Sequence, residues 1–117
     1  RLGIPISLDY QLTPRTVPTY QAIHLLQIAR EALSNIHKHA QASQVSIQVI
    51  NQRGEVTLSV CDNGCGLPQD TLRPDHYGLI IMRDRAKSLH GRCEILPRNG
   101  GGTEVRVVFK PDNHAID

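Results

Sequence analysis

Apolar and polar residues alternate, or apolar residues cluster in short runs, at several places along this chain. Such patterns predict β-strands, because successive side chains of a strand point to opposite faces of its sheet. Strands are expected at residues 4–12, 45–50, 56–61, 93–96 and 104–109. The first is expected to be half-buried, since it alternates regularly from Ile6 onward. The second and third are joined by Asn51-Gln52-Arg53-Gly54, which predicts a hairpin.

Two stretches instead have the spacing of helices. In residues 19–40 apolar side chains recur every three or four positions, after Pro14 and Pro18 have broken the first strand. This spacing predicts a buried helix face composed of Ile23, Leu26, Ala29, Leu33, Ile36 and Ala40. Residues 78–89 predict a second helix that closes near Gly91. Residues 62–77 are expected to be a loop, and the polar tail after Pro111 is expected to fray.

Helices and strands therefore mix without strict alternation. The expected fold is α+β, a two-layer sandwich with helices packed on one face of a mixed sheet. The chain has 117 residues, which suits a single domain over 1–117. It has one Phe, three Tyr and no Trp, so its core must be aliphatic. The chain begins without methionine and reads as a fragment of a longer protein.

Charge and cysteine content narrow the class of function. The formal net charge of +2 does not by itself indicate a nucleic-acid or membrane partner. No apolar run approaches the ~20 residues that cross a bilayer. Cys61, Cys65 and Cys93 are odd in number, which favours a reducing compartment. Cys61 and Cys65 could suggest a metal site, but no second pair completes four zinc ligands.

The long helix carries one polar stripe. At about 100° per residue, Glu31, Asn35 and Lys38 fall close together, with His39 beside them. An amide oxygen suits Mg²⁺, a carboxylate can orient water or a hydroxyl, and a lysine can hold phosphate. The alternative is that this stripe is the solvated side of an amphipathic helix.

A glycine-containing segment, Asp62-Asn63-Gly64-Cys65-Gly66, directly follows an apolar strand. Its glycines would let a ligand approach the backbone, and Asp62 could accept a hydrogen bond from an exocyclic amine such as that of adenine. A dinucleotide-binding loop is disfavoured, since Gln69 occupies the third glycine position and no helix opens there. An ordinary turn is the remaining alternative.

Two further glycine motifs follow. Gly78 at a helix start would expose free backbone amides, a suitable seat for phosphate, although it could be an ordinary cap. Gly100-Gly101-Gly102-Thr103 precedes the last strand and could be a plain hairpin turn or could add the Thr103 hydroxyl to the same pocket. Arg83, Arg85 and Lys87 are more typical of a solvated face than of a nucleic-acid site.

In combination, these motifs resemble the N, G1, G2 and G3 boxes of the family that contains histidine kinases, DNA gyrase, Hsp90 and MutL. The matching patterns are Glu31-x-x-x-Asn35-x-x-Lys38-His39-Ala40, Asp62-x-Gly64-x-Gly66, Gly78-Leu79 and Gly101-Gly102-Thr103, within about residues 20–109. The runs REALSNIHKHAQAS and HYGLIIMRDRAKSLHG, with a short lid between Gly66 and Gly78, resemble the nitrate/nitrite sensor histidine kinases.

The resemblance implies the Bergerat ATP-binding fold, with ATP and Mg²⁺ as cofactors. By motif, Asn35 would bind Mg²⁺, and Lys38 and His39 would contact the phosphates. Asp62 would receive the adenine amino group, and Thr103 would complete that network. The other implied ATP-binding positions are Gly64, Gly66, Leu67, Gly78, Leu79, Gly101 and Gly102. Glu31 aligns with the catalytic carboxylate that activates water in related ATPases, whereas a kinase has a histidine acceptor.

The resemblance also implies partners. The chain would present ATP to a histidine on an upstream dimerisation domain that is expected to lie outside this chain, so the chain alone would not phosphorylate itself. The parent protein would be a homodimer in the bacterial inner membrane, with this domain cytoplasmic and no direct contact with nucleic acid. Its response regulator would carry a LuxR-type DNA-binding domain.

Three other functions share these boxes. They are an anti-sigma-type serine kinase, an ATPase of the gyrase or MutL type, and an interaction module that has lost nucleotide binding. The Gly-Leu-x-x-Met-x-x-Arg-Ala pattern from Gly78 to Ala86 favours the histidine kinase.

Overall fold

The computed structural model describes residues 5–12, 16–65 and 77–112. Its elements, in chain order, are β1 (Ile6–Gln11), α1 (Thr19–Asn35), the π-helical turn η1 (Ile36–Ala40), β2 (Val45–Gln52), β3 (Glu55–Asp62), α2 (Tyr77–Ser88), β4 (Arg92–Pro97) and β5 (Thr103–Phe109). Each predicted strand and helix is present, with boundaries shifted by a few residues.

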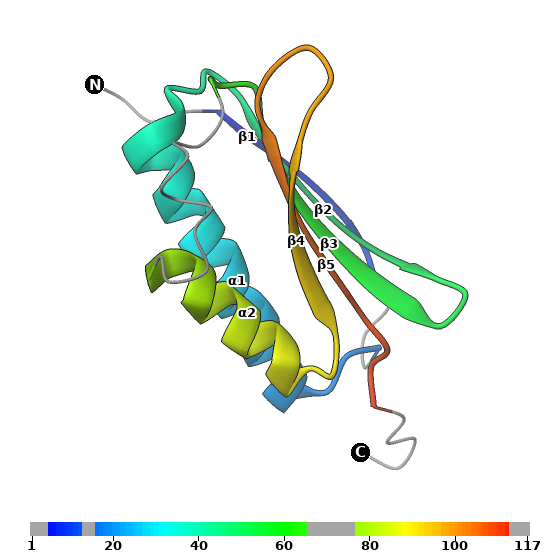
Figure 1. The fold of residues 1–117 in the computed structure, drawn as a ribbon. Coiled ribbons are helices and arrows are strands. Elements are labelled where there is room, and N and C mark those ends of the chain that lie inside the picture. The colour runs from blue at the N-terminus through cyan, green and yellow to red at the C-terminus, as the bar shows by residue number, and fades with distance from the viewer. Residues whose placement is uncertain (1–4, 13–15, 66–76, 113–117) are drawn as a thin grey trace.

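The strands form one five-stranded sheet in the order β1-β2-β3-β5-β4. β1 pairs parallel to β2, and the other three pairings are antiparallel. Both helices lie on the same side of this sheet, and the opposite face is open (Figure 1). The predicted α+β fold, with helices on one face of a mixed sheet, is therefore confirmed.

The core lies between the two layers and follows the alternation of the central strands. On β3 the buried positions are Val56, Leu58, Val60 and Asp62. On β5 the same alternation buries Thr103, Val105, Val107 and Phe109. The inward rows of both strands are therefore apolar until they reach a polar residue at one end. Both polar residues lie at the end of the sheet where the β4–β5 turn is found, because Thr103 follows this turn and Gly102 packs on Asp62.

The predicted buried face of the first helix is wrong in its N-terminal half. Ile23 is 51% exposed and Leu26 is 61% exposed. The buried row of α1 consists of Gln21, Leu25, Ile28, Ala32 and Asn35. The error arises because α1 has two apolar stripes. One packs on the sheet and α2, and the other, containing Leu26, borders a groove of about 440 Å³ open to solvent.

The predicted half-burial of the first strand is also wrong, since all six residues of β1 are exposed. β1 is an edge strand. Its apolar residues Leu8 and Tyr10 line the same groove as Leu26 rather than entering the core. Alternation predicted the strand, but it could not show that none of the described elements buries its apolar side. Within the described ranges, neither helix combines the length and hydropathy of a membrane span.

Candidate functional site

Asp62 is the last residue of β3 and is only 1% exposed. It occupies the inward position that follows Val56, Leu58 and Val60, so the pleat of the strand directs its side chain between the layers. Its Oδ1 accepts a hydrogen bond of 2.7 Å from the backbone N–H of Gly64. A buried carboxylate needs such donors, because burial without them is strongly unfavourable. A ligand amine would be a further donor of the right kind.

The turn before β5 packs directly on Asp62. A β-carbon placed on Gly102 would lie 1.9 Å from the backbone oxygen of Asp62, so no other residue fits there without movement of the backbone. Gly102 also has φ +100°, which disfavours other residues. Thr103, the next residue, is buried at the inward start of β5. The predicted G3 motif therefore lies beside the predicted G1 motif.

The second cluster lies where α1 meets α2. A β-carbon on Gly78 would lie 2.8 Å from Oε2 of Glu31 and 3.3 Å from both Nδ2 and Oδ1 of Asn35. These three predicted residues are thus brought together by the close approach of the two helices. The idea that the stripe is only a solvated helix face fails for Asn35, which is 4% exposed.

The side-chain amide of Asn35 has an incomplete set of partners. Its Nδ2 is buried and has no hydrogen-bond partner among the described residues. Buried polar atoms are nearly always hydrogen-bonded, so an orphan of this kind needs an explanation, and a ligand supplies one. Asn35 also ends the regular α-helix, because the chain continues as η1. Such π-helical turns occur frequently at functional sites.

The remaining predicted site residues differ in their surroundings, and some of them fall outside the described ranges. Lys38 is exposed on η1, and His39 belongs to the same turn, but its side chain lies outside the described part. Leu79 is buried in the hydrophobic core. Gly101 lies near Gly64, with 3.6 Å from its would-be β-carbon to the Gly64 oxygen. The predictions for Gly66 and Leu67 fall on residues outside the described ranges.

Asn63 connects the η1 end of the site to the Asp62 end. Its Oδ1 accepts hydrogen bonds from the backbone N–H groups of Ser43 and Gln44, both at 2.9 Å. Its Nδ2 donates to Oγ of Ser43, also at 2.9 Å. Ser43 and Gln44 lie between η1 and β2, so one side chain fixes the start of β2 against the end of β3.

Two cysteines of the sheet, Cys61 and Cys93, have raised pKa values. Burial, with a smaller contribution from the Glu104 carboxylate, raises the pKa of the Cys61 thiol. Burial also raises the pKa of Cys93 to about 11. Both thiols are therefore protonated at neutral pH, which makes them weak nucleophiles. Across residues 5–12, 16–65 and 77–112, no three His, Cys, Asp or Glu side chains gather as a metal-binding group.

The sequence did not reveal the role of two residues that contact Asp62 or adjoin it. The sequence pattern places Asn63 in a glycine-containing segment and assigns no role to Arg98. Nη1 of Arg98 donates a 2.7 Å hydrogen bond to the backbone oxygen of Asp62. No local motif marks such a contact, because the two residues are 36 positions apart in the sequence.

Known proteins resemble this chain in both sequence and fold. Residues 20–113 match the family described as histidine kinase-, DNA gyrase B-, and HSP90-like ATPase. The chain is 57% identical over 117 residues to the nitrate/nitrite sensor protein NarX of Escherichia coli strain K12, covering 100% of this chain and 20% of that protein. It is 38% identical over 106 residues to NarQ of the same strain, covering 90% of this chain and 19% of that nitrate/nitrite sensor protein.

Solved structures agree on the fold. The blue-light activated histidine kinase of Erythrobacter litoralis superimposes with a TM-score of 0.75 at 24% identity, covering 94% of this chain and 36% of that one. The histidine kinase AdeS of Acinetobacter baumannii gives a TM-score of 0.76 at 18% identity, covering 94% and 55%. The chain spans about a fifth of the length of the curated sensor proteins it matches. Because this family matches residues 20–113, most of the chain, the chain belongs to the histidine kinase-, DNA gyrase B- and HSP90-like ATPases.

Proposed function

We propose that this chain holds Mg-ATP and positions its γ-phosphate for transfer to a histidine outside the chain. The observation that carries this proposal is the buried amide of Asn35, whose Nδ2 lacks a partner and which faces Gly78. The absence of a β-carbon on Gly78 lets α2 pack directly against Asn35 and Glu31. A polar ligand that reached the Asn35 amide would satisfy it.

The residues fit Mg-ATP at two ends. Asp62 and Thr103 would recognise the adenine amino group, because both are buried polar residues at inward strand positions. Asn35 would hold Mg²⁺ through its amide oxygen, which a half-turn of the amide brings to the position of the orphaned nitrogen. Bound Mg²⁺ would neutralise charge on the phosphates. Gly64, Gly101 and Gly102 would allow close approach of the backbone to the nucleotide.

Phosphoryl transfer depends mostly on positioning and charge neutralisation. Lys38 is exposed on η1 directly after Asn35 and would stabilise phosphate charge with its ammonium group. His39, Gly66, Gly78, Leu67 and Leu79 would complete the phosphate and lid contacts. Glu31 would orient the attacking nitrogen of the acceptor histidine or its proton. In the reaction, the bond between the γ-phosphorus and the bridging oxygen breaks and a phosphorus–nitrogen bond forms, leaving ADP.

The rest of the parent protein follows as part of the same proposal. The acceptor histidine would lie on an upstream dimerisation domain, in a homodimeric sensor anchored in the inner membrane with this domain in the cytoplasm. Nitrate or nitrite would be the stimulus, since both relatives are named nitrate/nitrite sensor proteins. The partner would be a response regulator with a LuxR-type DNA-binding domain.

Titration calorimetry with a nonhydrolysable ATP analogue, with and without Mg²⁺, tests the proposal. The wild-type chain should bind, and Asp62→Ala should lose most of its affinity while remaining folded by circular dichroism. Asp84→Ala is the matched control, since Asp84 is an exposed carboxylate on α2. Absence of binding by the folded wild-type chain would contradict the proposal.

An ATPase of the gyrase or MutL type is the second candidate. The side chain of Glu31 points toward Asn35 and Gly78, where a carboxylate could activate water. Steady-state release of phosphate by the chain alone would favour this candidate. Transfer of label from γ-labelled ATP to an added histidine-containing helical domain, without such release, would favour the kinase. Labelling of serine on a partner would indicate the serine kinase.

A further inference from the structure

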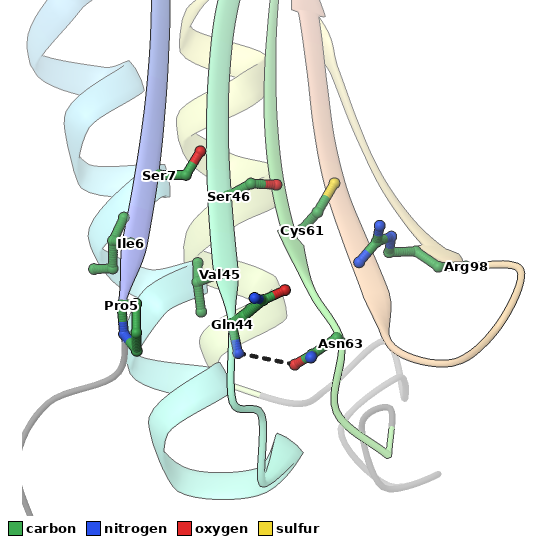
Figure 2. Close-up of a pocket in the computed structure, with 9 residues that line it drawn as sticks. All are labelled: Pro5, Ile6, Ser7, Gln44, Val45, Ser46, Cys61, Asn63 and Arg98. Carbon is green, nitrogen blue, oxygen red and sulfur yellow. Dashed lines mark hydrogen bonds between the residues drawn. The ribbon is translucent and has the colours of Figure 1, made fainter.

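A pocket of mixed polar and apolar lining lies beside the end of β3, next to Asp62. Figure 2 shows Ser46, Cys61 and Arg98 among its lining side chains, and its volume is about 370 Å³. Asp62 itself is buried and points to the opposite face, toward the helices. The two faces are therefore separated at this point only by the backbone of β3.

Arg98 contacts that backbone from the cavity side. Its Nη1 donates a 2.7 Å hydrogen bond to the backbone oxygen of Asp62. Arg98 lies just after β4, in the turn that leads to β5, and this turn is closed by two backbone hydrogen bonds. The N–H of Arg98 donates to the oxygen of Gly102 at 3.1 Å, and the N–H of Gly101 donates to the oxygen of Arg98 at 3.2 Å. The guanidinium is thus presented from a fixed turn.

Gly102 restrains the same oxygen atom. Its would-be β-carbon lies 1.9 Å from the Asp62 oxygen and 2.8 Å from the carbonyl carbon. The Asp62 carbonyl is therefore packed against Gly102 while it accepts a charged hydrogen bond from Arg98. Because the orientation of a carbonyl and the direction of its own side chain depend on the same backbone dihedral angles, these two contacts also restrain the carboxylate.

We propose that Arg98 is a positioning residue for nucleotide recognition, which fixes the Asp62 carboxylate toward adenine by holding the Asp62 carbonyl from the far face of the sheet. The inference rests on the proposed ATP-binding function. Arg98 does not touch the nucleotide. Its loss would loosen the backbone at the end of β3, and the interaction most sensitive to that movement is the hydrogen bond between Asp62 and the adenine amine.

The test compares Arg98→Met, which keeps a long side chain without a donor, with Arg98→Lys, which restores a charged donor. Affinities for ATP and GTP analogues are measured by calorimetry on the whole chain. Arg98→Met should weaken ATP binding about tenfold, which is the effect of losing one well-placed polar contact. It should change GTP binding much less, because guanine has an oxygen where adenine has the amine. Arg98→Lys should recover part of the discrimination.

Arg92→Met is the matched control. Arg92 is an exposed arginine on β4, and its Nε lies 3.8 Å from Oε1 of Glu94. This variant should keep the wild-type ratio of ATP to GTP affinity. A purely structural effect of Arg98 would lower the melting temperature and weaken both nucleotides equally. An unchanged ratio in folded Arg98→Met would overturn the inference.

A second readout needs no nucleotide. The backbone N–H of Gly64 donates to Oδ1 of Asp62, so its amide resonance reports on the position of the carboxylate. That resonance should shift in Arg98→Met and return toward the wild-type position in Arg98→Lys. If Arg98→Met does not fold, Arg98→Ala replaces it, since alanine also has no side-chain donor. Failure of the wild type to bind ATP would overturn the proposed function. An unshifted Gly64 amide resonance in Arg98→Met would overturn the role of Arg98.

Discussion

Gly78 at the start of α2 lies so close to Glu31 of α1 that a β-carbon on it would be 2.8 Å from Oε2 of that carboxylate. The same β-carbon would be 3.3 Å from both polar atoms of the Asn35 amide. A side chain at this position would therefore displace both Glu31 and Asn35, two residues of the proposed ATP site. The start of α2 and the polar stripe of α1 come into contact only in the folded chain, so neither sequence motif alone predicts this contact.

Gly78→Ala should weaken binding of a magnesium-loaded ATP analogue by about tenfold, because the added methyl group displaces Glu31 and Asn35. Helix propensity alone would make this substitution favourable or neutral, so a fall in affinity without loss of structure would identify the clash. Calorimetry and circular dichroism measure the two effects separately.

Gly54→Ala supplies the control. Gly54 has φ +81° and nothing within 4 Å of its would-be β-carbon, and it lies in the turn between β2 and β3. Its substitution should lower the melting temperature while leaving nucleotide affinity unchanged. Equal affinities of Gly78→Ala and wild type would contradict the assigned contact.

Asn35→Ala should abolish the dependence of ATP-analogue binding on Mg²⁺. The domain should remain folded, with a melting temperature equal to or above that of the wild type, because the change removes a buried nitrogen that lacks a partner. Titrations with and without Mg²⁺ measure the dependence, and Asn51→Ala at an exposed position of β2 is the control. Retained magnesium dependence in Asn35→Ala would remove Asn35 from this role.

Ile28→Ala and Ile23→Ala test which side of α1 is buried. Ile28 is 0% exposed, so its truncation should lower the free energy of unfolding by about 2–4 kcal/mol. Ile23 is more than half exposed, and its truncation should lower it by less than about 1 kcal/mol. Urea unfolding measures both. Similar losses for the two variants would mean that α1 is rotated from the orientation described above.

Cys93 should make stability fall at alkaline pH. Burial raises its pKa from 9.0 to about 11, with Arg83 opposing and Glu94 adding to the shift. Between these values the unfolded chain loses the thiol proton before the folded chain does, so the free energy of unfolding decreases as pH rises. Below pH 9 the thiol is protonated in both states and its contribution is constant.

The comparison of wild type with Cys93→Ala isolates this effect from other titrating groups. The wild type should lose about 2–3 kcal/mol more than the variant between pH 9 and 11. Urea unfolding at intervals across that range provides the measurement. Parallel pH profiles for the two chains would show that the Cys93 thiol titrates alike in both states.

The strand pattern predicted much of this site. Alternation along β3 and β5 is local information, and it places Asp62 and Thr103 on the inward face beside the core valines. The order of the glycine motifs predicted that these residues belong with Asn35 and Gly78. These predictions needed only the pleat of a strand, the period of a helix and the resemblance to known boxes.

The phase of α1 and the contact made by Arg98 could not be predicted in this way. α1 has two apolar stripes, and only the packing of α2 and the sheet decides that Ile28 is buried and Ile23 is exposed. Arg98 reaches Asp62 because β4, β5 and β3 are neighbours in the sheet, a pairing between distant segments. Local pattern contains no information about either arrangement.

The contacts of Asn63 with Ser43 and Gln44 also bear on the order of folding. β2 and β3 are joined by the shortest strand connection in the sheet, and their hairpin is closed at one end by its turn and at the other by Asn63. Short loops close with little loss of chain entropy, whereas the parallel pairing of β1 with β2 must wait for the whole α1 segment to fold back. Half of the adenine-recognition residues would therefore be ordered early, before the helices dock. The phosphate-binding part of the site would be completed last, when α1 and α2 pack onto the strands that have already formed.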